Sequence, residues 1–252
     1  MTLAARLKQD GLSLIPYLMA GHPDLDTTRE VGRKLVNTGI AAIELGIPYS
    51  DPLADGPVIQ RAGQRALDAG TTTEGCLEVA ADIAAEQAAP VILMTYVNPV
   101  LAYGPERFAR DAAEAGVAGV IIPDVPVEES ADIARTITAA GLDTVFLVAP
   151  TSPDERIVAA ATASTGFVYC VTVTGITGSR SALHPDVHGL LAKVRSHTDL
   201  PVAAGFGISS AEQVSLLREH ADAAIVGSAI VNELDAGRDP GPLVRELLSA
   251  CK

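Results

Sequence analysis

The chain has 252 residues, a formal net charge of −13 and a composition that is 48% hydrophobic, without tryptophan. Its length suits one α/β barrel, a fold that typically has about 250 residues. The acidic balance argues against nucleic acid as a partner, because negative charge repels phosphate backbones. No apolar run approaches the roughly 20 residues of a membrane span, so we expect no membrane contact, and we identify no signal peptide.

The cysteines are three in number and far apart in the chain, at Cys76, Cys170 and Cys251. Their spacing matches neither a disulfide framework nor a metal site. We therefore expect no metal ion, and a reducing, cytoplasmic setting.

Short apolar runs alternate with amphipathic stretches along the whole chain. The runs predict eight strands, at Ser13–Met19, Ala41–Ile47, Val91–Tyr96, Gly119–Pro123, Thr144–Ala149, Phe167–Val173, Val202–Phe206 and Ala223–Val226. The stretches between them predict helices, among them Asp26–Asn37, Thr73–Gln87, Pro105–Ala115, Ser130–Ala140, Asp154–Ala163, Pro185–Ser196, Ser210–Glu219 and Pro240–Ala250. Gly39, Gly116 and Gly141 are placed to end helices, and Ser209 or Ser210 to begin one.

Strands that alternate with helices indicate a parallel sheet. Eight such units favour a single-domain (β/α)8 TIM barrel over residues 1–252. An open doubly wound sheet is the alternative, but no GxGxxG turn follows the first strand. In such a barrel the active site lies at the carboxyl ends of the strands.

Glu44 stands inside the apolar second strand, where an ionised carboxylate without a partner is costly. It could belong to a buried ion pair, or it could be a general acid or base at the barrel mouth. Burial raises the pKa of a carboxyl group toward neutrality, which suits proton transfer.

The loop after this strand, Pro48–Pro57, carries Asp51 and Asp55 among three prolines. Asp-Pro and Asp-Gly are ordinary turn formers. The prolines would also stiffen a loop that presents a side chain accurately. From the loop alone, Asp55 is equally a turn residue and a catalytic residue.

Three later turns are rich in glycine: Thr174–Ser179, Gly205–Ile208 and Gly227–Ile230. The last two follow strands seven and eight, where such barrels commonly bind phosphate. Glycine lets backbone N–H groups approach an anion, and Ser228 adds a hydroxyl donor. We favour a phosphate site over simple tight turns.

Two residues near strand ends are weaker candidates. His22 follows the first strand, and we favour a turn-capping role over a direct one. Asp124 follows the fourth strand, where it could orient a loop or contact a partner.

Three segments together resemble the tryptophan synthase α subunit family: Glu44–Pro57 (ELGIPYSDPLADGP), Asp124–Glu129 (DVPVEE) and Gly205–Ser209 (GFGIS). The resemblance extends from Pro16 to about Val231. It implies cleavage of indole-3-glycerol phosphate to indole and glyceraldehyde 3-phosphate, a carbon–carbon lyase reaction in tryptophan biosynthesis.

The resemblance also implies roles for individual residues. Glu44 and Asp55 match the family's catalytic pair. Substrate contacts would come from Tyr17 and Tyr169 on the indole side, and from Thr177, Gly178, Gly207, Gly227 and Ser228 on the phosphate side.

The family works with a second chain, the β subunit, which implies an αββα complex in which indole passes between subunits. Pyridoxal phosphate is expected in that partner and no cofactor in this chain, and Asp51 would contact the partner. Two other functions stay open: a stand-alone indole-releasing lyase, and a catalytically weak subunit that regulates a partner.

Overall fold

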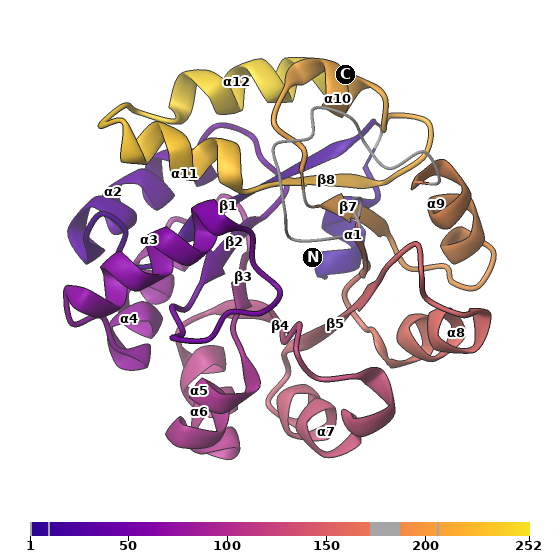
Figure 1. Ribbon diagram of the computed structural model, residues 1–252, viewed down its shortest axis with the longest axis horizontal. Helices are drawn as coiled ribbons and strands as arrows, with labels where there is room; N and C mark the ends of the chain where they lie inside the picture. The colour runs from indigo at the N-terminus through magenta and orange to yellow at the C-terminus, as the bar shows by residue number, and fades with distance from the viewer. Residues whose placement is uncertain (1, 10, 172–186, 206) are drawn as a thin grey trace.

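The computed structural model describes residues 2–9, 11–171, 187–205 and 207–252. Eight parallel strands, hydrogen-bonded in chain order from β1 to β8, close into a barrel that helices surround (Figure 1). The predicted (β/α)8 fold is confirmed. The strands are β1 (Ser13–Met19), β2 (Ile43–Gly46), β3 (Val91–Met94), β4 (Val117–Ile121), β5 (Asp143–Val148), β6 (Val168–Val171), β7 (Val202–Gly205) and β8 (Ala223–Val226).

The helices include every one predicted above and several more. They are α1 (Leu3–Leu7), α2 (Leu25–Val36), α3 (Pro57–Asp68), α4 (Thr73–Ala84), α5 (Val97–Tyr103), α6 (Pro105–Glu114), the 3-10 helix η1 (Val127–Glu129), α7 (Ala131–Ala139), α8 (Asp154–Ala163), α9 (Val187–Arg195), α10 (Ala211–Ser215), α11 (Ser228–Asp235) and α12 (Gly241–Ala250).

Several element ends differ from the predicted ones. β4 begins at Val117, two residues before the predicted start, because a register shift beside Val91 brings this residue into the sheet. α10 ends at Ser215 and not at Glu219, since the next residues form turns around the fully buried Leu217. The predicted helix ends are confirmed elsewhere. Gly39, Gly116 and Gly141 have φ of 94°, 75° and 84°, and Ser210 caps α10 through the N–H of Gln213.

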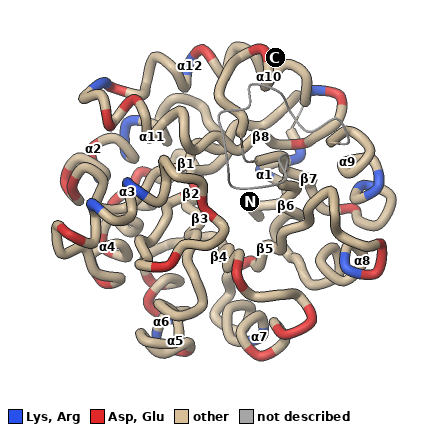
Figure 2. Tube along the Cα trace, viewed as in Figure 1, with Lys and Arg blue, Asp and Glu red and all other residues tan. Residues whose placement is uncertain are grey.

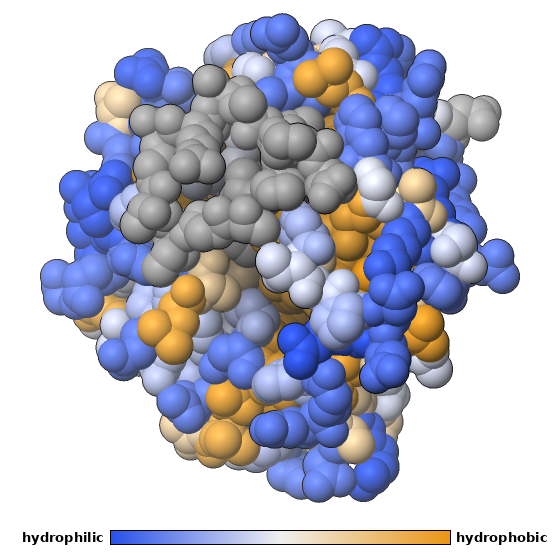
Figure 3. Space-filling model, turned by 45° about the vertical axis from the view of Figure 1, so that its right-hand side comes forward, coloured by the Kyte–Doolittle hydropathy of each residue, from blue (hydrophilic) through white to orange (hydrophobic). Residues whose placement is uncertain are grey.

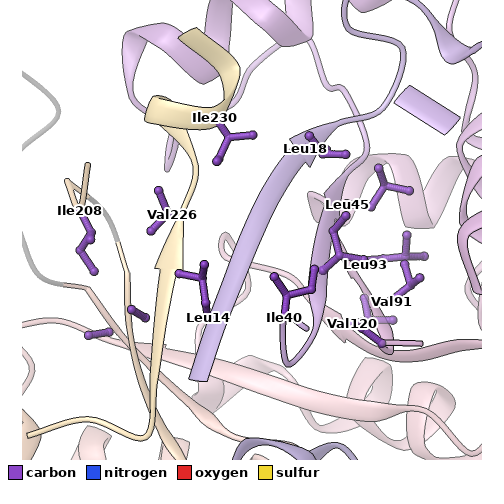
Figure 4. Close-up of a cluster of buried hydrophobic side chains, with 14 of the residues drawn as sticks. Leu14, Leu18, Ile40, Leu45, Val91, Leu93, Val120, Ile208, Val226 and Ile230 are labelled. Carbon is purple, nitrogen blue, oxygen red and sulfur yellow. The ribbon is translucent and has the colours of Figure 1, made fainter. Parts of the chain in front are cut away.

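The buried apolar residues form two clusters. The larger lies between the strands and the helices and contains Leu14, Leu18 and Leu45 (Figure 4). The smaller contains Ile15, Tyr17 and Met19 from the same strand β1, together with Leu3 and Leu7 of α1. Successive side chains of a strand point to opposite faces. The smaller cluster therefore fills the barrel, and α1 closes one end of it.

This alternation decides where Glu44 points. Its neighbours Ile43 and Leu45 belong to the larger cluster, between the strands and the helices. The Glu44 side chain therefore points into the barrel.

Charged residues of both signs are interspersed along the outer helices and loops (Figure 2). On the face shown in Figure 3, hydrophobic residues appear in separate patches bordered by hydrophilic ones. Within the described ranges, no helix has the length and apolar character needed to cross a bilayer.

Candidate active site

Glu44 lies on β2, opposite Tyr17 of β1 and Ile92 of β3 in the strand register. Its side chain is 1% exposed. In the part of the chain that the structure describes, the Oε2 atom has no hydrogen-bond partner. Burial, and then the nearby charge of Asp55, raise the pKa of Glu44 to about 8. This carboxyl group can therefore hold or release a proton near neutral pH.

Asp55, in the loop after β2, is also buried, with 6% of its surface exposed. Burial raises the pKa of Asp55 to about 6, while a hydrogen bond from Tyr96 opposes this rise. The Tyr96 hydroxyl in turn accepts the Ala54 N–H at 3.0 Å. Gln60 of α3 also binds this loop, since its Nε2 donates to the Asp55 carbonyl oxygen at 2.9 Å. The loop thus presents Asp55 in a defined position.

Tyr96 was not singled out from the sequence. It ends the predicted third strand, where a polar aromatic residue closes an apolar run, and this was the available signal. Its contact with a loop 42 residues earlier could not be read from the pattern.

The two carboxyl groups differ in protonation between about pH 6 and pH 8. In this window Asp55 is mainly ionised and Glu44 mainly protonated. Ionisation of one group also disfavours ionisation of the other, so the two titrate as a pair. The site therefore offers a proton donor beside a fixed negative charge.

Tyr17 and Tyr169 lie on the inner face of the barrel and are 5% and 3% exposed. Both interact electrostatically with Glu44 and Asp55, and burial raises the pKa of both phenols well above its ordinary value. They stay neutral and supply aromatic walls beside the carboxyl groups.

Glycines make room for these rings. A Cβ on Gly46 would lie 2.0 Å from the Tyr17 hydroxyl oxygen, and one on Gly205 would lie 2.3 Å from that of Tyr169. Each tyrosine thus covers a glycine on the next strand of the barrel. The register is the same in both places, since the glycine stands two residues beyond the tyrosine's partner.

The glycine turns after β7 and β8 stand at the same end of the barrel. Gly207 has φ of 79°, a left-handed conformation that favours glycine. Gly227 precedes α11, whose first residue is Ser228, and no side chain caps this helix within the described segments. Its first N–H groups are therefore available to an anion. Thr177 and Gly178 lie outside the described residues.

The remaining candidates take different positions. Asp51 is exposed in the Asp55 loop, and it accepts a hydrogen bond from Ser50 Oγ at 2.5 Å. Asp124 accepts the Val97 N–H at 3.0 Å, and it thereby orients the start of α5. His22 is 2% exposed, and its Nε2 lies 2.9 Å from Oδ1 of Asp235 on α11, outside its own turn, so the predicted turn-capping role is wrong.

A sequence profile described as "Tryptophan synthase alpha chain" matches residues 3–251. The tryptophan synthase alpha chain of Prochlorococcus marinus is 50% identical over 249 residues, which cover 98% of this chain and 90% of that one. This chain belongs to the tryptophan synthase alpha chain family. The alpha chain of Solibacter usitatus is 47% identical over 242 residues, covering 96% and 91% of the two chains.

Solved structures of the family share the fold. A chain of Mycobacterium tuberculosis tryptophan synthase superposes with a TM-score of 0.92 at 37% identity, covering 99% of this chain and 97% of that one. A mutant alpha subunit from Pyrococcus furiosus gives a TM-score of 0.86 at 36% identity, covering 95% and 99%. The barrel described above is thus the fold of tryptophan synthase alpha chains.

Proposed function

We propose that the chain cleaves indole-3-glycerol phosphate to indole and glyceraldehyde 3-phosphate, with Glu44 moving the protons. This is the reaction of the tryptophan synthase alpha chain family. The observation that carries the assignment of Glu44 is its burial beside Asp55 with a pKa raised to about 8. A buried ion pair, the alternative reading of Glu44, is unsupported, because no cation pairs with it in the described chain.

The reaction needs one group that both gives and takes a proton. Protonated Glu44 donates its proton to C3 of the indole ring, which leaves positive charge on the ring nitrogen. The Glu44 carboxylate then removes the proton of the hydroxyl on the adjacent glycerol carbon. The oxygen's electrons form the aldehyde carbonyl, the carbon–carbon bond breaks, and its electrons return to the ring. Glu44 ends protonated, as it began.

Asp55 has the complementary role. As an anion it accepts the indole N–H and stabilises the positive charge that develops on the ring nitrogen. Tyr17 and Tyr169 would form the walls of the indole site. Gly207, Gly227 and Ser228 would hold the phosphate, with Thr177 and Gly178 as further contacts. Two identical groups thus take different roles because their surroundings differ.

The family works with a β subunit, and pyridoxal phosphate belongs to that subunit. We propose an αββα assembly in the cytoplasm, with indole passed to the partner and no cofactor in this chain, which forms one domain. Exposed leucines support a partner face at this end of the barrel: Leu53 and Leu101 are 81% and 56% exposed. They follow neighbouring strands, and Asp51 lies beside Leu53.

The central test replaces Glu44 with glutamine, which keeps the shape and removes the titrating proton. We expect Glu44→Gln to lower indole release by at least the roughly 10²–10⁴-fold that a positioned proton-transfer group contributes. Binding of a substrate analogue without the glycerol hydroxyls should persist. The matched control is Glu30→Gln, since Glu30 is an exposed residue of α2 that pairs with Lys34. Indole release near the wild-type rate by Glu44→Gln would refute the assignment.

The role of the partner needs a separate measurement. Steady-state indole production by the purified chain, with and without a β subunit, separates the alternatives. Low activity that the partner raises supports the lyase subunit. High activity without the partner supports a stand-alone lyase, and no activity in either case supports a regulatory subunit.

A further inference from the structure

Three elements around the barrel mouth meet at one carboxylate, Asp235, the last residue of α11. Its Oδ1 atom lies 2.5 Å from Nη1 of Arg65 on α3 and 2.9 Å from Nε2 of His22, which follows β1. The His22 side chain is buried, and the Asp235 side chain is 21% exposed. α3 and α11 lie side by side outside β1 (Figure 1).

Each helix carries a different part of the candidate site. α3 begins two residues after Asp55, and its Gln60 binds the Asp55 carbonyl oxygen. α11 begins at Ser228, directly after Gly227. Asp55 belongs to the indole end of the site, and Gly227 and Ser228 to its phosphate end. The distance between these ends therefore depends on how α3 and α11 are held together.

Other contacts fix each helix to the barrel but do not join the two helices through a charge. Gly63 of α3 faces Met19 of β1, since a Cβ there would lie 3.3 Å from the Met19 methyl carbon. Gly227 faces Tyr17 in the same way, since a Cβ added to this glycine would lie 3.5 Å from the Tyr17 Cβ. Among the described residues, Arg65–Asp235 is the ion pair that bridges α3 and α11.

We propose that Asp235 is a positioning residue: through Arg65 and His22 it holds α11 against α3 and sets the spacing between Asp55 and the phosphate site. The inference rests on the proposed function, because it supposes a substrate that spans both ends. Exposed ion pairs stabilise a fold little, and Arg65 is 58% exposed. A small error in the spacing of reacting groups can nevertheless cost a large factor in rate.

A ligand that reaches both ends of the site senses their spacing, whereas a fragment that fills one end does not. The test compares indole-3-propanol phosphate, an uncleavable analogue without the glycerol hydroxyls, with its fragments, indole and inorganic phosphate. For Asp235→Asn we expect the Kd of the analogue to rise about tenfold, which corresponds to about 1.4 kcal/mol. The Kd of each fragment should change less than twofold. The readouts are calorimetry for the analogue and NMR titration for the fragments.

Two further variants keep the test decisive. Arg65→Gln alters an exposed side chain. We expect the Kd of the analogue to rise about threefold in this variant, again without a comparable change for the fragments. Glu233→Gln is the matched control on α11, since Glu233 is 25% exposed and its ion pair among the described residues is with Arg238, just beyond the same helix. It should leave all three affinities unchanged.

Equal affinity of wild type and Asp235→Asn for the analogue would overturn the positioning role. Equal losses for the analogue and the fragments would also overturn it, because they would show general damage to the fold. A wild-type chain that fails to bind the analogue would instead count against the proposed function.

Discussion

The hydroxyl group of Tyr96 has two partners in the Asp55 loop. It accepts the Ala54 N–H and donates to the Asp55 carboxyl group. A hydrogen bond to a carboxylate stabilises the ionised form, so Tyr96 lowers the pKa of Asp55 against the effect of burial. The Oε2 atom of Glu44 has no such donor within the described chain. One hydroxyl group thus helps to separate the proton affinities of the two carboxyl groups.

The pH dependence of kcat/KM should show this effect. The acid limb should lie near pH 6, where Asp55 ionises, and the alkaline limb near pH 8, where Glu44 loses its proton. Tyr96→Phe removes the donor and should move the acid limb upward by about 1 pH unit, with little change in the alkaline limb. The substrate phosphate also titrates near pH 6, but it is the same in both enzymes.

Tyr49→Phe is the control for this prediction. The Tyr49 ring lies 5.3 Å from that of Tyr96, and its hydroxyl accepts from Asn98 Nδ2 at 2.6 Å. This hydroxyl makes no hydrogen bond to Glu44 or Asp55, so the pH profile of kcat/KM for Tyr49→Phe should match that of the wild type. An unchanged acid limb in Tyr96→Phe would contradict the role assigned to the hydroxyl.

At the scale of the elements, the Tyr17 ring of β1 lies over a position of β2 without a side chain, Gly46. β6 and β7 repeat the arrangement with Tyr169 over Gly205. Glycine weakens a strand interior unless something must approach the backbone closely. In both places the group that approaches the glycine backbone is an aromatic ring of the candidate site.

Gly46→Ala should therefore destabilise the chain by about 1–3 kcal/mol, the usual cost of overpacking. The cost should fall in a Tyr17→Leu background, where the ring is absent. Urea denaturation of the wild type, the two single variants and the double variant measures the coupling between Gly46 and Tyr17. Gly56→Ala is the control, since φ is −76° there and a Cβ would meet nothing within 4 Å. Additive effects of the Gly46 and Tyr17 changes would argue against the close packing.

The sequence predicts local features better than long-range contacts. Strands β1 and β8 lie where their apolar runs predict them, and Glu44 is conspicuous as a charge inside such a run. The position of Asp55 depends on Tyr96, which comes 41 residues later, and no local pattern connects the two. The same holds for Arg65 and Asp235, 170 residues apart. A barrel brings all carboxyl strand ends together, but it does not specify which side chains meet there.

At the scale of the whole molecule, the loops of the candidate site and exposed apolar side chains share one end of the barrel. Leu101, on the short helix α5 after β3, is 56% exposed. Exposed apolar residues beside polar ones commonly mark a protein interface. We expect the β subunit to cover this end.

Leu101→Asp should weaken the complex with a β subunit at least tenfold, which corresponds to about 1.4 kcal/mol. Cleavage by the isolated chain should not change. Leu216→Asp is the matched control: Leu216 is 54% exposed and follows the end of α10, on another side of the barrel (Figure 1). Titration of the β subunit against each variant gives the affinities. Equal Kd values for wild type and Leu101→Asp would exclude α5 from the interface.

The burial of Glu44 also makes folding a proton-uptake reaction. The folded pKa is about 8 and the ordinary value 4.5, so between these values the folded chain binds more protons than the unfolded one. Stability must then decrease as pH rises from about 5 to about 8.

Relative to wild type, Glu44→Gln should gain about 1–3 kcal/mol in the free energy of unfolding over this range. Equal gains at pH 5 and pH 8 in urea denaturation would contradict the linkage. Under this linkage the stability cost of burying Glu44 grows as the pH approaches 8, where this acid begins to ionise, so natural selection for activity and for stability would act on this one residue in opposite directions.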